Sequence, residues 1–123
     1  MRNPPHILVV DDSKVSRTVV CGLIRNRIPE AVFLEAGDGR SALALALAER
    51  PDLVLLDINI PDMSGLEVAE QLRAQAPELR LALLTANAQD ATRAKAEVLG
   101  VPLFRKPAKA EVIEQVLSLL VEP

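Results

Sequence analysis

The sequence has very few aromatic residues, one cysteine and one histidine. Its 123 residues include two Phe and no Trp or Tyr, so stacking on flavins or single-stranded bases has little to depend on. The single Cys21 cannot form an intramolecular disulfide, and its apolar neighbours predict a packed side chain. His6 precedes the first predicted strand with no second histidine or nucleophile beside it, which indicates a solvated or edge histidine and no catalytic role.

Charge and hydropathy exclude further classes of function. The net charge is −3 and the isoelectric point about 5.2, which predicts no direct nucleic-acid partner. No apolar run approaches the roughly 20 residues of a membrane span, and no signal peptide opens the chain. We therefore expect a cytoplasmic protein without a membrane partner, formed as one domain over residues 1–123.

Short apolar runs alternate with segments of helical spacing along the whole chain. The runs predict strands at residues 7–10, 31–36, 53–57, 81–84 and 103–105. Helices are predicted at residues 14–28, 40–50, 65–76, 89–99 and 109–121. Crossovers of this length imply an α/β fold, a doubly wound five-stranded parallel sheet of order 2-1-3-4-5 with five helices, as in flavodoxin-like proteins.

Polar residues capable of joint chemistry stand where the predicted strands end. These residues are Asp11, Asp12, Asp57, Thr85 and Lys106. They should converge, because the carboxyl ends of parallel strands meet at one edge. Two carboxylates ~4 Å apart repel by ~4 kcal/mol at an effective dielectric of 20, and one lysine offsets only part of this repulsion. A divalent cation would complete the neutralisation, and oxygen ligands favour Mg²⁺ over zinc.

Five segments in this order resemble the receiver domains of bacterial two-component response regulators. The segments are ILVVDDS, EAGDGRSAL, PDLVLLDINIPDMSGLE, LLTA and RKP. The resemblance implies that Asp57 is the phosphoacceptor. It also implies that Asp12, Asp57 and the backbone carbonyl of Asn59 coordinate Mg²⁺, with Asp11 acting through bound water.

The resemblance also assigns roles to the residues of the fourth and fifth strands. Lys106 would pair with the phosphoryl oxygens, the Thr85 hydroxyl would move to hydrogen-bond them, and the bond before Pro107 would be cis. Receivers usually carry Tyr or Phe three residues before the lysine, where this chain has Leu103. Because Phe104 should point to the opposite face of the strand, we expect switching through the backbone between Thr85 and the Ala-rich helix at 89–99.

The family implies a switch that catalyses nothing on an outside substrate and assists only its own phosphorylation and dephosphorylation. Its phosphoryl donor would be a sensor histidine kinase or a histidine phosphotransfer protein. A downstream protein would bind through the last two helices and the fifth strand, where Val112 and Leu119 are expected to face outward.

Two alternatives stay open beside this interpretation. Met1 beside the first strand favours a stand-alone receiver, but the chain could also be a receiver excised from a hybrid histidine kinase or a multidomain response regulator. An aspartyl-phosphate phosphatase is the remote alternative. It would need a second Asp two residues after Asp57 as general acid, and Asn59 occupies that position.

Overall fold

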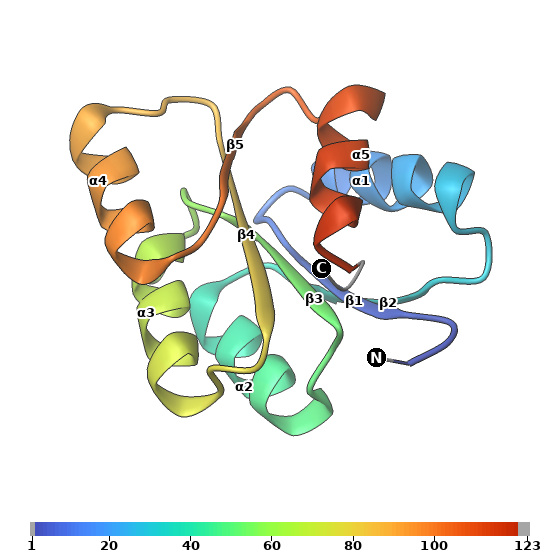
Figure 1. Ribbon diagram of the computed structural model, residues 1–123, viewed down its shortest axis with the longest axis horizontal. Helices are drawn as coiled ribbons and strands as arrows, with labels where there is room; N and C mark the ends of the chain where they lie inside the picture. The colour runs from blue at the N-terminus through green and yellow to red at the C-terminus, as the bar shows by residue number, and fades with distance from the viewer. Residues whose placement is uncertain (1, 121–123) are drawn as a thin grey trace.

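Five parallel strands form the centre of the computed structural model, which describes residues 2–120 (Figure 1). The strands are β1 (His6–Val10), β2 (Val32–Ala36), β3 (Leu53–Asp57), β4 (Arg80–Thr85) and β5 (Leu103–Arg105). Each pairs with its neighbours in the order β2-β1-β3-β4-β5. The predicted fold class and strand order are confirmed.

Helices α1 to α4 connect successive strands as crossovers, and α5 follows the last strand. Their bounds are α1 (Lys14–Arg27), α2 (Gly39–Glu49), α3 (Gly65–Gln75), α4 (Asp90–Leu99) and α5 (Ala110–Leu117), the last followed by a 3-10 turn at Ser118–Leu120. These bounds agree with the predicted ones to within one or two residues, except that α5 ends earlier; the predicted end at Val121 lies outside the described residues. Between residues 2 and 120 no helix is both long and apolar enough to cross a membrane.

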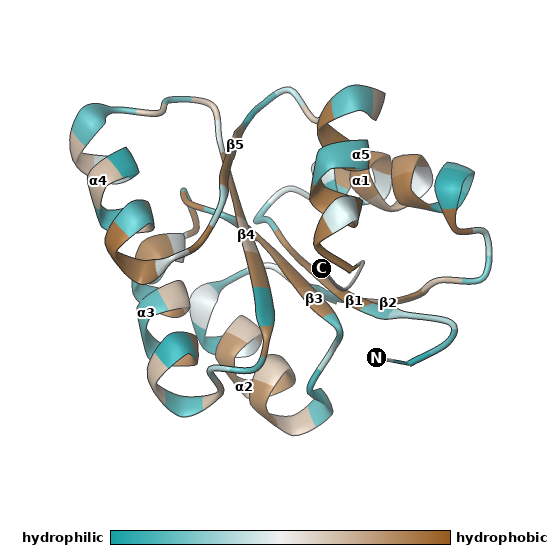
Figure 2. Cartoon of the chain, in the orientation of Figure 1, coloured by the Kyte–Doolittle hydropathy of each residue, from teal (hydrophilic) through white to brown (hydrophobic). Residues whose placement is uncertain are grey.

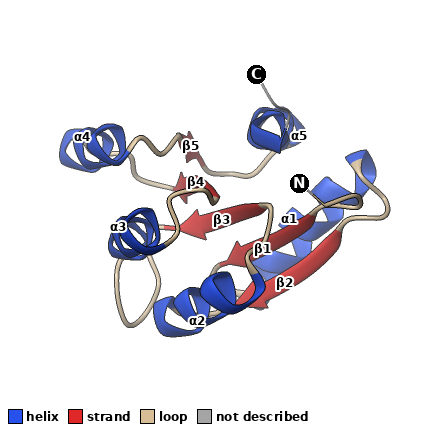
Figure 3. Cartoon of the chain, turned by 60° about the horizontal axis from the view of Figure 1, so that its bottom comes forward, coloured by secondary structure: helices blue, strands red, loops and turns tan. Residues whose placement is uncertain are grey.

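Alternate residues of the central strands supply two separate cores, one on each face of the sheet. Helices lie on both sides of the sheet (Figure 3). In β3, for example, Val54 and Leu56 pack towards α2, α3 and α4, whereas Leu53 and Leu55 pack towards α1 and α5. All four side chains are at most 1% exposed. Burial on both faces explains why β3 is an uninterrupted apolar run (Figure 2).

Helix α1 presents fewer of its apolar residues to the core than its spacing suggests. The buried stripe is formed by Val20, Cys21 and Ile24. Val15 and Val19 lie one helical turn apart on another side and are 74% and 51% exposed. The fold therefore leaves two valines of this helix at the surface, because a helix on an open sheet buries only one stripe.

The prediction that Val112 and Leu119 face outward from the last helix is wrong. Val112 and Leu119 are half-buried and pack against the core shared by α1, α5 and the sheet. The exposed side of this segment is instead polar, with Glu111, Glu114, Gln115 and Ser118. The apolar stripe of this helix is simply wider than the sequence pattern indicated, with Ile113 and Val116 at its centre.

Helix α4 buries fewer of its residues than any of the other four helices. Among its residues 90–99, all of them described, only Ala96 is buried, as the Ala-rich sequence predicts. Its N-cap residue Gln89 makes no side-chain capping bond. The other end is held better, since the Arg73 guanidinium donates to the carbonyl oxygens of Leu99 and Gly100 at 3.2 and 3.3 Å.

Candidate metal centre

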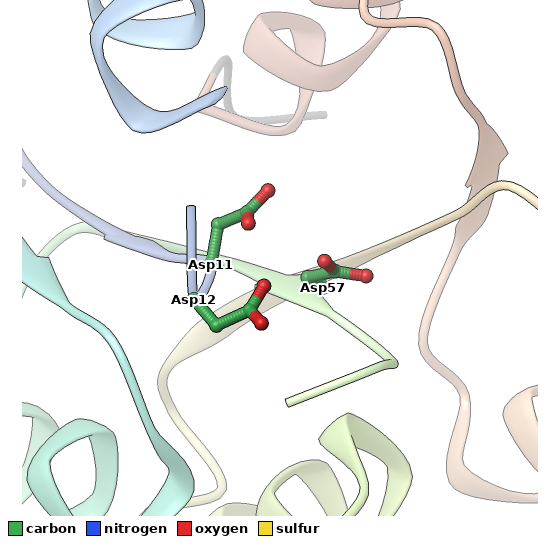
Figure 4. Close-up of side chains that lie close together, drawn as sticks. All are labelled: Asp11, Asp12 and Asp57. Carbon is green, nitrogen blue, oxygen red and sulfur yellow. The ribbon is translucent and has the colours of Figure 1, made fainter. Parts of the chain in front are cut away.

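Three carboxylates gather at the carboxyl ends of β1 and β3 (Figure 4). These strands are neighbours, with Val10 beside Leu56, so Asp11 and Asp57 emerge at the same edge of the sheet. One carboxylate oxygen each from Asp11, Asp12 and Asp57 lies within 4.8 Å of the others. Asp11 and Asp57 are buried and Asp12 is exposed, so the cluster opens to solvent on one side.

Local hydrogen bonds fix the direction of two of these carboxylates. The Ser13 amide donates to Asp11 Oδ1 at 2.9 Å, and the Ser13 hydroxyl in turn caps α1 by accepting from the Ser16 amide. The Asn59 amide donates to Asp57 Oδ1 at 3.2 Å. Each strand therefore ends in a turn that holds its aspartate in place.

Lys106 provides the positive charge at the centre of the cluster. Its Nζ donates to Asp57 Oδ2 at 2.9 Å and to Asp11 Oδ2 at 3.1 Å. Partial burial alone would lower the pKa of Lys106, but the hydrogen bonds and charges of Asp57 and Asp11 outweigh it and raise the pKa above its usual value. The ammonium is therefore charged at neutral pH and joins the two buried carboxylates.

One ammonium against three ionised carboxylates leaves the cluster with a net charge of −2. The donor set consists of oxygens, which suits a hard divalent cation, and the exposed side leaves space for water or a ligand. The acidic cluster can therefore bind a metal ion.

The remaining predicted site residues belong to β4, β5 and the turn after β5. Thr85 is buried, and its hydroxyl accepts from the Asn87 amide at 3.1 Å and lies 3.2 Å from the Asn87 carbonyl oxygen, so it is directed into the turn after β4. The Lys106–Pro107 peptide bond is cis. Leu103 packs with the α2, α3 and α4 core and Phe104 with the opposite core, which confirms that they point to opposite faces.

One residue beside the cluster, Arg17, was not predicted from the sequence. Arg17 of α1 donates through Nη1 to the Asp11 carbonyl oxygen at 2.6 Å and through Nε to Glu35 at 2.9 Å. It therefore ties the end of β1 to α1 and β2 and adds a second positive charge nearby. An arginine one turn into the helix that follows paired aspartates is the signal that could have indicated it.

The fold and the acidic edge define a class of signalling protein. The chain matches the family model of the response regulator receiver domain over residues 7–118 and belongs to this family.

Relatives of this chain have different functions. A probable transcriptional regulatory protein of Mycobacterium tuberculosis, TcrX, is 46% identical over 83 residues, which are 68% of this chain and 35% of TcrX. A protein-glutamate methylesterase/protein-glutamine glutaminase of Anaeromyxobacter dehalogenans is 34% identical over 85% of this chain and 31% of that protein. The chain thus spans about a third of the length of these relatives.

Solved structures match over nearly the whole chain. The chemotaxis protein CheY4 of Vibrio cholerae is 27% identical, with a TM-score of 0.83 over 95% of this chain and 98% of that one. A CheY-like receiver from Methanospirillum hungatei has a TM-score of 0.86 at 23% identity and shares the fold.

Proposed function

We propose that this chain is a phosphorylation-controlled switch of the cytoplasm, in which Asp57 accepts a phosphoryl group from a sensor histidine kinase or a histidine phosphotransfer protein. A carboxylate oxygen of Asp57 attacks phosphorus, and the bond between phosphorus and the donor breaks, leaving an acyl phosphate. The observation that carries the proposal is the placement of Asp57, a buried member of the acidic cluster whose Oδ2 accepts a hydrogen bond from Lys106 at 2.9 Å. The receiver domain would extend over residues 1–123.

Mg²⁺ is the cation proposed for the cluster. Asp12, Asp57 and the Asn59 carbonyl would hold it, and Asp11 would act through bound water. When bound, it would neutralise the charge of the carboxylates and of the incoming phosphoryl oxygens. Lys106 would then exchange its contact with Asp57 for one with the phosphoryl group, and burial of Asp57 would keep competing water away.

Direct transfer from a small donor tests this proposal. With Mg²⁺ and acetyl phosphate, the intact mass of the protein should rise by one phosphoryl group, and hydroxylamine should remove it because acyl phosphates are labile to that reagent. A chelator should prevent the mass increase. Absence of phosphorylation in the presence of Mg²⁺, or a product that resists hydroxylamine, would contradict the proposed chemistry.

The protein donor is proposed to dock beside the acidic edge. A cavity of about 430 Å³ extends from Asp11 and Lys106 past Pro107 to Val15 and Val19. The two valines are more than half exposed and supply an apolar rim to the cavity that Asp11 and Lys106 also line. Such a rim suits the apolar side of a helix that carries the donor histidine.

Val15→Asp should separate docking from chemistry. A charge on the apolar rim should slow transfer from the phosphorylated histidine protein about tenfold or more. Transfer from acetyl phosphate, which needs no docking, should be unchanged. Val98→Asp is the matched control, since Val98 is 87% exposed on α4 and does not line this cavity. Equal transfer rates for wild type and Val15→Asp with the protein donor would place docking elsewhere.

Phosphorylation is proposed to change the conformation of α4 through Thr85. A target protein is proposed to bind the surface formed by α4, β5 and α5. Capture of the phosphoryl group would draw the Thr85 hydroxyl away from Asn87. The turn after β4 would follow, and α4 has little packing to resist because only Ala96 is buried among its described residues. Leu103 offers no aromatic ring to report this shift, so it is proposed as an atypical switch position.

Amide hydrogen exchange with and without beryllium fluoride, in the presence of Mg²⁺, measures this conformational change. The largest change in protection should fall within residues 86–99, because the charge-assisted hydrogen bond to Thr85 biases that segment. Little change is expected at Leu103. Strong protection at Leu103 with none in α4 would place the switch in β5 instead.

A further inference from the structure

Asp62 joins the loop that follows β3 to the start of a different helix. The β3–α3 loop comprises residues 58–64 and begins directly after Asp57. Asp62 Oδ1 accepts from the Gly39 amide at 2.7 Å and Oδ2 accepts from the Arg40 amide at 2.9 Å. Both amides belong to the first turn of α2, so both oxygens of one carboxylate bridge two segments that are more than twenty residues apart in the chain.

These two bonds complete the capping of α2. The first four amides of a helix have no partner within the helix. Asp38 takes the Ser41 amide with its side chain at 2.7 Å and the Ala42 amide with its carbonyl oxygen at 3.1 Å. Gly39 and Arg40 are left, and Asp62 satisfies both. The bonds from these backbone amides lower the pKa of Asp62, so its carboxylate is charged at neutral pH.

The loop also packs closely against the helix. A Cβ placed on Gly39 would overlap the Met63 side chain and lie 3.1 Å from Asp62 Oδ1. The far end of the loop is closed by the Gly65 amide, which donates to the Ile58 carbonyl oxygen at 2.9 Å. Asn59 lies between Ile58 and Asp62, exposed and bonded to Asp57 Oδ1 through its own amide.

We propose that Asp62 is a positioning residue for the metal centre, which fixes the β3–α3 loop on the α2 N-terminus and thereby holds the Asn59 carbonyl towards the acidic cluster. This inference rests on the proposed function, which gives Asn59 its role as a ligand. Asp62 itself would not touch the cation. Ile60 is buried in the core and the Gly65 amide bonds to Ile58, so the loop has two other points of attachment, and Asp62 adds the one that joins it to α2. The Asn59 carbonyl is placed by backbone alone and so depends on how this loop is held.

Titration calorimetry of Mg²⁺ into the metal-free protein tests the inference without any phosphoryl transfer. Asp62→Ala should weaken Mg²⁺ binding about tenfold, within the range found for outer groups that orient ligands. Hydrogen exchange of amides 58–64 should become faster in the same variant. Asp62→Asn keeps one acceptor oxygen, so its Mg²⁺ affinity should fall between those of wild type and Asp62→Ala. It serves in place of Asp62→Ala if that variant does not fold.

Asp38→Ala is the matched control. It removes one carboxylate and one cap from the same end of α2, but it leaves the bridge to the β3–α3 loop in place. We expect its Mg²⁺ affinity to stay near that of wild type. Equal losses in Asp38→Ala and Asp62→Ala would assign the effect to charge or to α2 capping and would overturn the inference.

Three other results bear on the inference, two of them against it and one for it. Unchanged affinity in Asp62→Ala, or a wild-type protein that binds no Mg²⁺, would overturn it. If wild type binds Mg²⁺ but accepts no phosphoryl group from acetyl phosphate, a selective loss of affinity in Asp62→Ala would still support the positioning role, while the proposed phosphoacceptor function would fail.

Discussion

Asp57→Asn should abolish the phosphorylation that acetyl phosphate and Mg²⁺ produce in the wild-type protein. The amide has nearly the same shape as the carboxylate, so the buried position between Lys106 and Asn59 stays filled. An amide, however, has no anionic oxygen to attack phosphorus and form an acyl phosphate. Intact-mass spectrometry of the two proteins, treated in parallel, provides the measurement.

The variant should fold at least as well as wild type in the absence of metal. Removing one of three neighbouring carboxylates lowers the repulsion in the cluster, although it also weakens the contact with Lys106. Asp90→Asn is a suitable control, because Asp90 is an exposed acid in the first turn of α4. Phosphorylation of Asp57→Asn to the same extent as the control would show that another residue is the acceptor.

Gly65→Ala should destabilise the protein by about 3 kcal/mol, the upper part of the range for overpacking at a site that cannot relax. Gly65 begins α3, and a Cβ there would overlap the Asp57 carbonyl oxygen and lie 2.9 Å from the Ile58 Cα. Both obstacles are backbone atoms, so no side-chain rotation relieves the clash. The chain can accept the methyl group only if the loop moves away from the end of β3.

Gly22→Ala is the matched control for this change. Gly22 lies inside α1, and a Cβ there meets nothing within 4 Å. Alanine should therefore stabilise the protein by about 0.5–1 kcal/mol through helix propensity alone. Urea unfolding followed by far-ultraviolet circular dichroism measures both variants, since the chain has no Trp or Tyr for fluorescence. Equal stability of Gly65→Ala and wild type would show that the loop is not tightly packed against β3.

Displacement of the loop should also affect phosphorylation. In Gly65→Ala the strain falls on the backbone of Asp57 itself, so transfer from acetyl phosphate should be slower than in Gly22→Ala under conditions where both are folded. A slower transfer in Gly65→Ala would show that the packing of the loop helps to place the proposed phosphoacceptor.

The sequence by itself determined the fold and its order of elements. Continuous apolar runs such as the one at 53–56 are typical of strands buried on both faces, and helices between successive strands favour parallel pairing. From that topology alone, Asp11, Asp12, Asp57 and Lys106 could be placed at one edge, because strand ends are positions in the sequence.

Only the tertiary structure decided which surfaces stay open and which distant groups meet. Helical spacing cannot separate exposed Val15 and Val19 from buried Val20, since the exposed fraction depends on where the sheet and α5 lie. The same holds for Val112 and Leu119, whose half-burial depends on the packing around α5. The bridge from Asp62 to the α2 N-terminus has no sequence signal, because it depends on the close approach of a loop and a helix that are more than twenty residues apart in the chain.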